Sequence, residues 1–231
     1  MWGAQQMNSM SYIKAILFDL DGIIIDTESI YMNLMLKFND SYKIFISKEY
    51  YISNILGKTK NQISSLLKED ILKNKSVEDY WKGLLKYREN YINENEIKVK
   101  NGFFDFANYL KKNKIILGIV TSNSLQLVKK LLRKAEIDIN IFDIIVTSDD
   151  VSATKPNPEL YLTALKKINI KSRQAIAIED SNVGIMSAVS AGIKVINVPD
   201  IDKITATNKE NCLAIVQSLD NIINIFEERK S

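Results

Sequence analysis

Short apolar runs recur along this chain of 231 residues, and polar residues bound each of them. Continuous apolar runs of this length are typical of strands that are buried on both faces of a sheet. Segments with apolar residues at helical spacing lie between them, so the alternation predicts an α/β fold with a parallel sheet, right-handed crossovers and helices on both faces. The predicted strands are Ile13–Phe18, Ile115–Val120, Ile144–Thr147, Ala175–Ile178 and Lys194–Val198, and the predicted helices are Phe103–Asn113, Ser124–Ala135, Pro158–Ile168 and Asn182–Ala191.

The segment 28–100 interrupts this alternation. It is rich in Tyr, Asn and Lys, it contains no convincing strand run, and its pattern predicts helices at Ile30–Phe38, Gln62–Leu72 and Val77–Asn93. We therefore expect a helical insert at 28–100 within an α/β core formed by 12–27 and 101–231, with Asn101-Gly102 as the turn back into the core. Residues 1–11 are expected to be a disordered leader.

Polar side chains follow four of the predicted strands. Asp19 and Asp21 follow the first strand, Thr121 ends the second, Lys155 lies in the loop after the third, and Glu179-Asp180 end the fourth. Ligands of open α/β sheets bind outside the carboxyl ends of the strands, so these motifs are expected to converge on one edge. Two carboxylates at the end of a buried strand are costly unless a positive charge lies between them, and a divalent metal is the simplest candidate.

Composition excludes several classes of function. The net charge is only +3 and no block of basic residues is present, which argues against a nucleic-acid partner. No apolar run approaches the roughly 18 residues of a membrane span, so no membrane partner is expected. The single cysteine, Cys212, excludes an internal disulfide and fits a reducing compartment, which predicts a cytoplasmic location. Cys212 itself is expected to be a small residue in or near the core.

The chain contains no histidine. This absence excludes a Ser-His-Asp or Cys-His site, a zinc site with histidine ligands and a histidine general base. Any acid–base chemistry must therefore be carried out by Asp, Glu, Lys or Tyr side chains.

Four motifs, in this order, resemble those of the haloacid dehalogenase superfamily. They are the run from Asp19-Leu20-Asp21-Gly22 to Asp26-Thr27-Glu28, then Thr121-Ser122-Asn123, Lys155-Pro156-Asn157-Pro158-Glu159, and Glu179-Asp180-Ser181-Asn182-Val183-Gly184. The resemblance extends from about Lys14 to the last helix and is closest to the branch of phosphatases and β-phosphoglucomutase-like enzymes. It implies a Rossmann-like core with a helical-bundle cap inserted after the first strand.

The resemblance implies a role for each motif, and elementary chemistry agrees. Asp19 would attack phosphorus and form an aspartyl-phosphate, while Asp21 would act as general acid and then as general base. Lys155 would supply positive charge, and Thr121 would donate a hydrogen bond to a phosphoryl oxygen. The remaining implied residues are Ser122 and Asn123 for substrate binding, and Asp19, Asp21 (through its carbonyl), Asp180 and Glu179 for a Mg²⁺ ion. Glu179 is expected to ligate either directly or through water, with a role beside the metal site as the alternative.

The insert would supply specificity by closing over the site. Leu56-Gly57-Lys58-Thr59-Lys60 resembles the cap loop that faces the active site in this branch, and Lys60 lies where mutase relatives carry a basic substrate-binding residue. The alternative for Lys60 is a solvated lysine at a helix start. Asp26 with Thr27-Glu28 is expected to fix the turn or hinge into the cap. Tyr31 lies where the β-phosphoglucomutases carry a histidine that assists proton transfer, which argues against mutase activity.

We therefore predict a Mg²⁺-dependent phosphatase that hydrolyses a small phosphorylated metabolite, most simply a sugar phosphate, through an aspartyl-phosphate. The nearest alternative is phosphoryl transfer of the β-phosphoglucomutase type, which uses the same core residues. A catalytically idle binding module is a remote alternative, because Asp19, Asp21 and Lys155 are all present. The protein is expected to be a monomer or a weak dimer.

Overall fold

The centre of the molecule is a six-stranded sheet with the strand order β3-β2-β1-β4-β5-β6, in which every pairing is parallel. The computed structural model describes residues 12–73, 76–201 and 204–227, so the predicted leader lies outside the described residues. All five predicted strands are present, with bounds that differ by at most two residues, and the predicted α/β fold is confirmed. The strands are β1 (Ala15–Phe18), β2 (Ile116–Val120), β3 (Ile144–Val146), β4 (Ala175–Glu179), β5 (Lys194–Asn197) and β6 (Cys212–Ile215).

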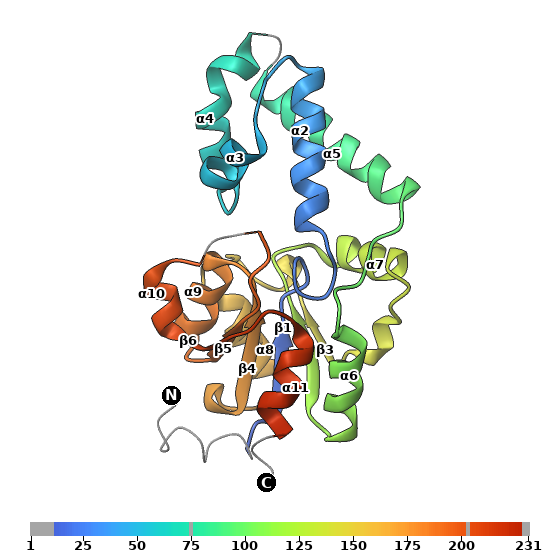
Figure 1. Cartoon of the computed structure of the whole chain (residues 1–231), viewed down its shortest axis with the longest axis vertical. Helices are drawn as coiled ribbons and strands as arrows, with labels where there is room; N and C mark the ends of the chain where they lie inside the picture. Colours follow the sequence, from blue (N-terminus) through green and yellow to red (C-terminus); the bar gives the residue numbers. More distant parts are fainter. Residues whose placement is uncertain (1–11, 74–75, 202–203, 228–231) are drawn as a thin grey trace.

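Helices cover both faces of the sheet (Figure 1). On one face, Ile16 and Phe18 of β1 pack in a cluster with α6 (Phe103–Lys112), α7 (Leu125–Lys134) and α11 (Leu219–Glu227). On the other face, Ala15 and Leu17 pack with α8 (Glu159–Lys167) and α9 (Asn182–Ser190). Because side chains alternate along a strand and both faces are covered, β1 must be apolar at every position.

Helix α6 corrects one expectation from the sequence. From helical spacing alone, the sequence predicts that Phe104, Ala107 and Leu110 share the apolar face of this helix, but Phe104 is 49% exposed. The buried residues of α6 are Phe103, Phe106, Ala107 and Leu110. These four positions follow the spacing of i, i+3, i+4 and i+7 on one helix face, and Phe104 is rotated away from that face.

The chain between β1 and α6 forms a bundle of helices that stands beyond the carboxyl ends of the strands (Figure 1). The three helices predicted there are present, and the described residues of 28–100 contain no named strand. A separate apolar cluster, which includes Phe38, Leu67 and Tyr80, holds the bundle together. Its elements are α2 (Glu28–Ser41), α3 (Lys48–Tyr50), the π-helical turn η1 (Tyr51–Ile55), α4 (Lys60–Leu72) and α5 (Val77–Glu94).

Two chain segments connect the bundle to the sheet core, and they are hydrogen-bonded to each other. The amide of Asp26 donates to the carbonyl of Lys98 at 2.9 Å, and the amide of Lys100 donates to the carbonyl of Ile24 at 2.9 Å. Ile25 and Val99 form an antiparallel bridge between these two bonds. The predicted re-entry turn at Asn101-Gly102 follows directly and leads into α6. The connection is therefore a short two-stranded ribbon.

Several short elements were not predicted from the sequence. They are β6, α10 (Ala206–Asn211), α3, η1 and three 3₁₀ turns, namely η2 (Ile139–Ile141), η3 (Ser148–Asp150) and η4 (Ser172–Gln174). Cys212 begins β6, where it is partly buried and packs against the apolar cluster of α8 and α9. Burial raises the pKa of its thiol to about 11. Across the helices that the structure describes, none is both long and apolar enough to cross a membrane.

Candidate active site

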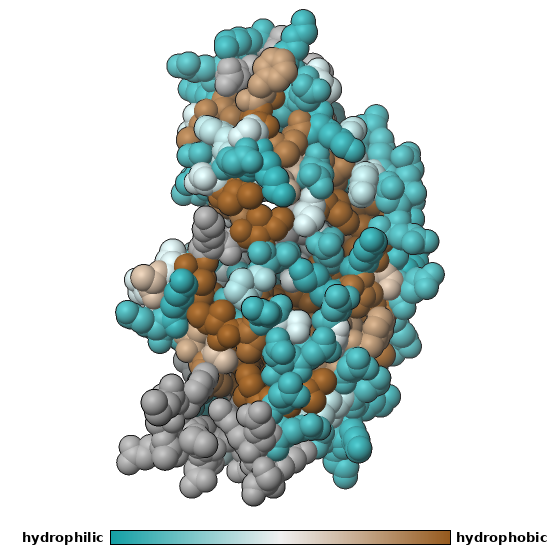
Figure 2. Space-filling view, viewed as in Figure 1, coloured by the Kyte–Doolittle hydropathy of each residue, from teal (hydrophilic) through white to brown (hydrophobic). Residues whose placement is uncertain are grey.

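Most of the residues singled out in the four motifs line one cavity at the carboxyl ends of β1, β2 and β4, whereas Glu179 is fully buried against Lys155 and is not part of the lining. The cavity has a volume of about 260 Å³ and opens between the sheet core and the helical bundle, where the molecular surface is indented (Figure 2). Most of the lining comes from the core, and the bundle contributes Tyr31, Leu56 and Gly57. The other lining residues are Asp19, Asp21, Thr121, Ser122, Asn123, Lys155, Asp180, Ser181 and Val183.

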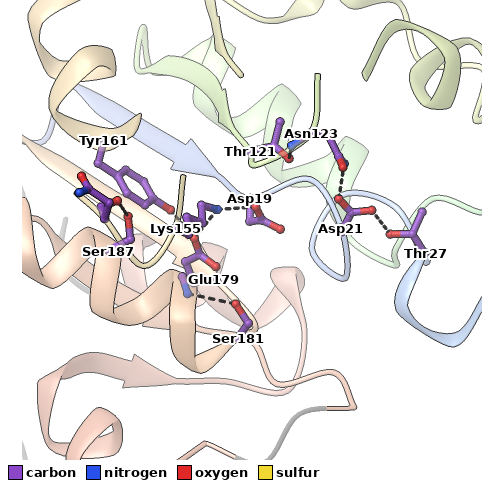
Figure 3. A network of polar contacts seen from close by, with 12 residues as sticks. Asp19, Asp21, Thr27, Thr121, Asn123, Lys155, Tyr161, Glu179, Ser181 and Ser187 are labelled. Carbon is purple, nitrogen blue, oxygen red and sulfur yellow. Dashed lines mark hydrogen bonds and ion pairs between the residues drawn. The ribbon is translucent and has the colours of Figure 1, made fainter. Parts of the chain in front are cut away.

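Lys155 connects two carboxylates on neighbouring strands. Its ammonium forms an ion pair with Asp19 after β1, and a second ion pair of 2.6 Å with Glu179 Oε1 at the end of β4 (Figure 3). The side chain of Lys155 is 5% exposed and that of Glu179 is fully buried. Burial alone would lower the pKa of Lys155, but the charges of Asp19 and Glu179 outweigh it and raise that pKa above its usual value. Lys155 is therefore a permanent positive charge beside Asp19.

Asp21 lies in a different environment from Asp19. Its two carboxylate oxygens accept hydrogen bonds from neutral donors, Thr27 Oγ1 at 2.5 Å and Asn123 Nδ2 at 2.6 Å (Figure 3). Burial and the nearby charge of Asp19 raise the pKa of Asp21 to about 6, against the lowering effects of both hydrogen bonds and of Lys155. Asp21 therefore holds its proton to a higher pH than an ordinary aspartic acid, as a general acid needs to.

The loop after β2 is shaped by its own polar side chains. Thr121 is 1% exposed, and its hydroxyl accepts the amide hydrogen of Asn123 at 3.2 Å. Ser124 caps α7, and Asp149 also accepts an amide from the first turn of this helix, that of Leu125, at 2.9 Å. The loop thus presents Thr121, Ser122 and Asn123 to the cavity at a helix N-terminus, which is a favourable place for an anion.

Three buried carboxylates in the site could hold a cation. One oxygen of each of Asp19, Glu179 and Asp180 lies within 4.8 Å of the others. Glu179 Oε2 is buried, and no donor among the described residues bonds to it. Lys155 is the only cationic side chain that lines the cavity in the described part of the chain, so the cluster retains excess negative charge. Oxygen ligands of this kind suit Mg²⁺, and the residues present therefore fit this ion.

Gly22 brings the Asp19–Asp21 turn close to Asp180. Its φ of +74° lies in the left-handed region, and a Cβ atom there would lie 2.1 Å from Asp180 Oδ2. A side chain at position 22 would therefore be strained and would also displace a candidate metal ligand. The glycine of the first motif is explained by this close approach.

Tyr161 is a buried residue of the site that was not singled out from the sequence. Its hydroxyl donates a hydrogen bond of 2.6 Å to Glu179 Oε1, and the Lys155 ammonium lies 5.4 Å from the centre of its ring. Two features of the sequence could have indicated that Tyr161 belongs to the site. Tyr161 lies on the apolar face of α8 with Leu160 and Ala164, and a buried tyrosine hydroxyl usually requires a polar partner.

The structure brings Lys60 to a different place from the other predicted site residues. Lys60 is exposed at the start of α4, its ammonium lies 5.6 Å from the centre of the Trp81 ring, and it is absent from the cavity lining. From the same loop, Leu56 and Gly57 do reach the cavity. Tyr31 also lines it, with the Arg88 guanidinium 5.4 Å from the centre of its ring.

We predict that Gly184→Ala lowers both stability and activity. A Cβ atom at this position would lie 1.9 Å from Glu179 Oε2, inside a fully buried contact. Overpacking of this kind costs about 1–3 kcal/mol, whereas Gly→Ala inside a helix otherwise gains roughly 1 kcal/mol. The free energy of unfolding, measured by denaturant titration, shows whether the substitution lowers or raises stability. An unchanged or raised stability would contradict the tight contact between α9 and Glu179.

Known proteins resemble this chain over most of its length. Residues 16–198 match the family model of haloacid dehalogenase-like hydrolases. The phosphorylated carbohydrates phosphatase of Thermotoga maritima is 27% identical over 218 residues, which cover 94% of this chain and 99% of that protein. The pyrophosphatase PpaX of Bacillus cereus is 29% identical over 184 residues, covering 79% and 81% of the two chains.

Solved structures show the same fold. The crystal structure of a putative β-phosphoglucomutase from Thermotoga maritima superimposes with a TM-score of 0.76 and 26% identity, covering 94% of this chain and 99% of that chain. The family model spans the strands β1 to β5 and the cavity residues that lie between them, so it includes all four motifs. The protein is an enzyme that belongs to the family of haloacid dehalogenase-like hydrolases.

Proposed function

We propose that the protein is a Mg²⁺-dependent phosphatase that hydrolyses a small phosphorylated metabolite of the sugar phosphate class. The observation that carries this proposal is the contrast between two carboxylates at one cavity. Asp19 is ion-paired with Lys155, whereas Asp21 is held by the neutral donors Thr27 and Asn123. The sugar phosphate class is suggested by a relative that is named a phosphorylated carbohydrates phosphatase.

The first half of the reaction transfers the phosphoryl group to Asp19. A carboxylate oxygen of Asp19 attacks phosphorus, and the bond from phosphorus to the oxygen of the leaving alcohol breaks. Asp21 gives its proton to that oxygen, so the alcohol leaves without charge. Its pKa of about 6 supports this role, because a usable fraction of Asp21 is protonated near neutral pH. Lys155 and the Thr121 hydroxyl contact the phosphoryl oxygens.

The second half hydrolyses the aspartyl-phosphate. Asp21, now ionised, accepts a proton from a water molecule as the water oxygen attacks phosphorus. The bond between phosphorus and the Asp19 oxygen then breaks, which releases inorganic phosphate and regenerates both carboxyl groups. Mg²⁺, held by Asp19, Asp180, the Asp21 carbonyl and Glu179 directly or through water, would neutralise phosphoryl charge.

We also propose that 28–100 is a cap that moves relative to the core formed by 12–27 and 101–231. Its own apolar cluster and its two-segment connection to the core support this division. Pocket residues Tyr31, Leu56 and Gly57 come from the proposed cap, so closure would surround the leaving group of the substrate. A cytoplasmic location and a monomer or weak dimer complete the proposal.

For Lys60 we predict that the change to Ala raises KM or reorders the preferred substrates, because cap closure would bring its charge toward the substrate. Steady-state kinetics on several phosphomonoesters would measure this. Lys58→Ala, two residues earlier in the same exposed loop, is the matched control. An unchanged KM and an unchanged order of substrates in Lys60→Ala would return Lys60 to the role of a solvated lysine that packs on Trp81.

Hydrolysis is favoured over phosphoryl transfer between sugar hydroxyls because Tyr31 lines the cavity and the chain has no histidine that could assist proton transfer. A screen of phosphorylated metabolites for released phosphate, with isomerisation of β-glucose 1-phosphate measured alongside, tests this choice. Phosphate release from one or more sugar phosphates without isomerisation is the expected result. Isomerisation faster than phosphate release would replace the phosphatase with a mutase.

A further inference from the structure

The polar network behind Asp19 contains one side chain that the chemistry above does not use. Tyr161 lies on α8, six residues after Lys155, and both its ring and the Glu179 carboxylate are fully buried (Figure 3). Its hydroxyl donates to Glu179 Oε1 at 2.6 Å, and the same oxygen receives the Lys155 ammonium at 2.6 Å. Glu179 thus connects Tyr161 to Lys155, and Lys155 connects Glu179 to Asp19.

The surroundings leave the Glu179 carboxylate few other orientations. Its second oxygen, Oε2, faces Gly184 so closely that a Cβ atom there would lie 1.9 Å away. Among the described residues, no donor bonds to Oε2. Within the chain segments that the structure describes, the Tyr161 hydroxyl is the neutral donor to Oε1 and Lys155 is the charged one, and together they fix the rotation of this carboxylate.

Tyr161 is itself held firmly. The loop that precedes α8 is tied to α9 by a hydrogen bond of 2.7 Å from Ser187 Oγ to the carbonyl of Asn157 (Figure 3). The ring packs in the apolar cluster formed by α8, α9 and one face of the sheet. A hydroxyl on such a rigid support can orient a carboxylate at small entropic cost.

We propose that Tyr161 is a positioning residue for the reaction. Its hydroxyl keeps the Glu179 carboxylate turned toward Lys155, and Glu179 in turn keeps the Lys155 ammonium against Asp19. This inference rests on the proposed function. Outer partners of this kind typically change activity or affinity by 10–100-fold when they are removed.

The test compares Tyr161→Phe with Tyr80→Phe. Phe keeps the ring and removes only the hydroxyl, so the fold and the stacking of Lys155 over the ring are retained. Tyr80 is the matched control, because its hydroxyl donates an equally short, buried hydrogen bond of 2.6 Å, to Asn39 within the helical bundle. Thermal unfolding of both variants measures how much stability is lost when a buried hydroxyl is removed, independently of any effect on activity.

We expect Tyr161→Phe to lower kcat/KM by about tenfold or more on the best phosphomonoester, and Tyr80→Phe to leave it within twofold. A double-mutant cycle with Glu179→Gln separates positioning from packing. If Tyr161 acts through Glu179, its removal has little further effect in the Glu179→Gln background. Equal losses in both backgrounds, or a Tyr161→Phe enzyme within twofold of wild type, would overturn the proposal.

A binding measurement, which requires no turnover, tests the positioning role of Tyr161 separately from the proposed phosphatase function. The affinity for inorganic phosphate, measured by calorimetry with Mg²⁺ present, reports on the placement of Lys155 in the resting protein. We expect phosphate to bind several-fold more weakly to Tyr161→Phe than to wild type or Tyr80→Phe. Equal affinities would overturn the positioning role, whereas a wild-type protein that binds phosphate but hydrolyses no phosphomonoester would overturn only the proposed function.

Discussion

Asp19→Asn is expected to abolish turnover and to leave the protein folded. The amide cannot form an acyl phosphate, and removal of a catalytic nucleophile costs on the order of 10⁴–10⁶ in kcat. The shape of the side chain is unchanged, and Lys155 keeps its second ion pair with Glu179, so no buried charge is left alone. Phosphate release tests the loss of turnover, and thermal unfolding of the same preparation tests whether the protein remains folded.

Asp143→Asn is the matched control for this variant. Asp143 precedes β3, at the opposite end of the sheet from the cavity, and its carboxylate accepts the amide of Leu117 at 2.8 Å. The Asp143→Asn variant should turn over substrate at the wild-type rate. More than a few per cent of activity in Asp19→Asn would show that another group attacks phosphorus.

Asp21→Asn is expected to lower kcat by about 10²–10⁴-fold, the usual contribution of a general acid–base group. The amide cannot exchange a proton with the leaving oxygen or with water. The chain has no histidine that could replace it, and Thr27 and Asn123 are hydrogen-bond donors without a suitable pKa. Steady-state hydrolysis of an alkyl phosphate measures this loss.

The nature of the leaving group makes the Asp21 prediction more specific. Nitrophenolate leaves without a proton, so Asp21→Asn should still release a burst of about one equivalent from p-nitrophenyl phosphate and then stall, because the water step needs a base. Steady alkyl phosphate hydrolysis at the wild-type rate would contradict the role of Asp21 in both steps.

The position of the candidate site could be predicted from the sequence for a simple physical reason. Asp19 and Thr121 each follow a strand that is apolar throughout, Glu179-Asp180 come directly after the apolar run Ala175–Ile178, and parallel strands bring their carboxyl ends to one edge. The order and spacing of the four motifs then determined the family, which the match over residues 16–198 confirms. Strong local patterns and one topological rule were sufficient for this part of the fold.

Other features depend on contacts that a local pattern does not contain. Strand β6 is not among them, because Cys212–Ile215 is apolar at every position and could have been predicted from the local pattern. The hydrogen bond from Tyr161 to Glu179 joins residues 18 positions apart on different elements. Lys60 packs on Trp81, a residue of another helix, and nothing in its own neighbourhood of the sequence indicates this. Tertiary structure decides each of these cases.

The most direct test of the central claim is phosphate release from a panel of phosphomonoesters by the wild-type protein, first stripped of metal with EDTA and then supplied with Mg²⁺. Asp19→Asn serves as the blank. The proposed site predicts no turnover in EDTA, turnover on addition of Mg²⁺, and none above background in Asp19→Asn. A folded protein that hydrolyses no phosphomonoester with Mg²⁺ present, or one that works equally well in EDTA, would contradict it.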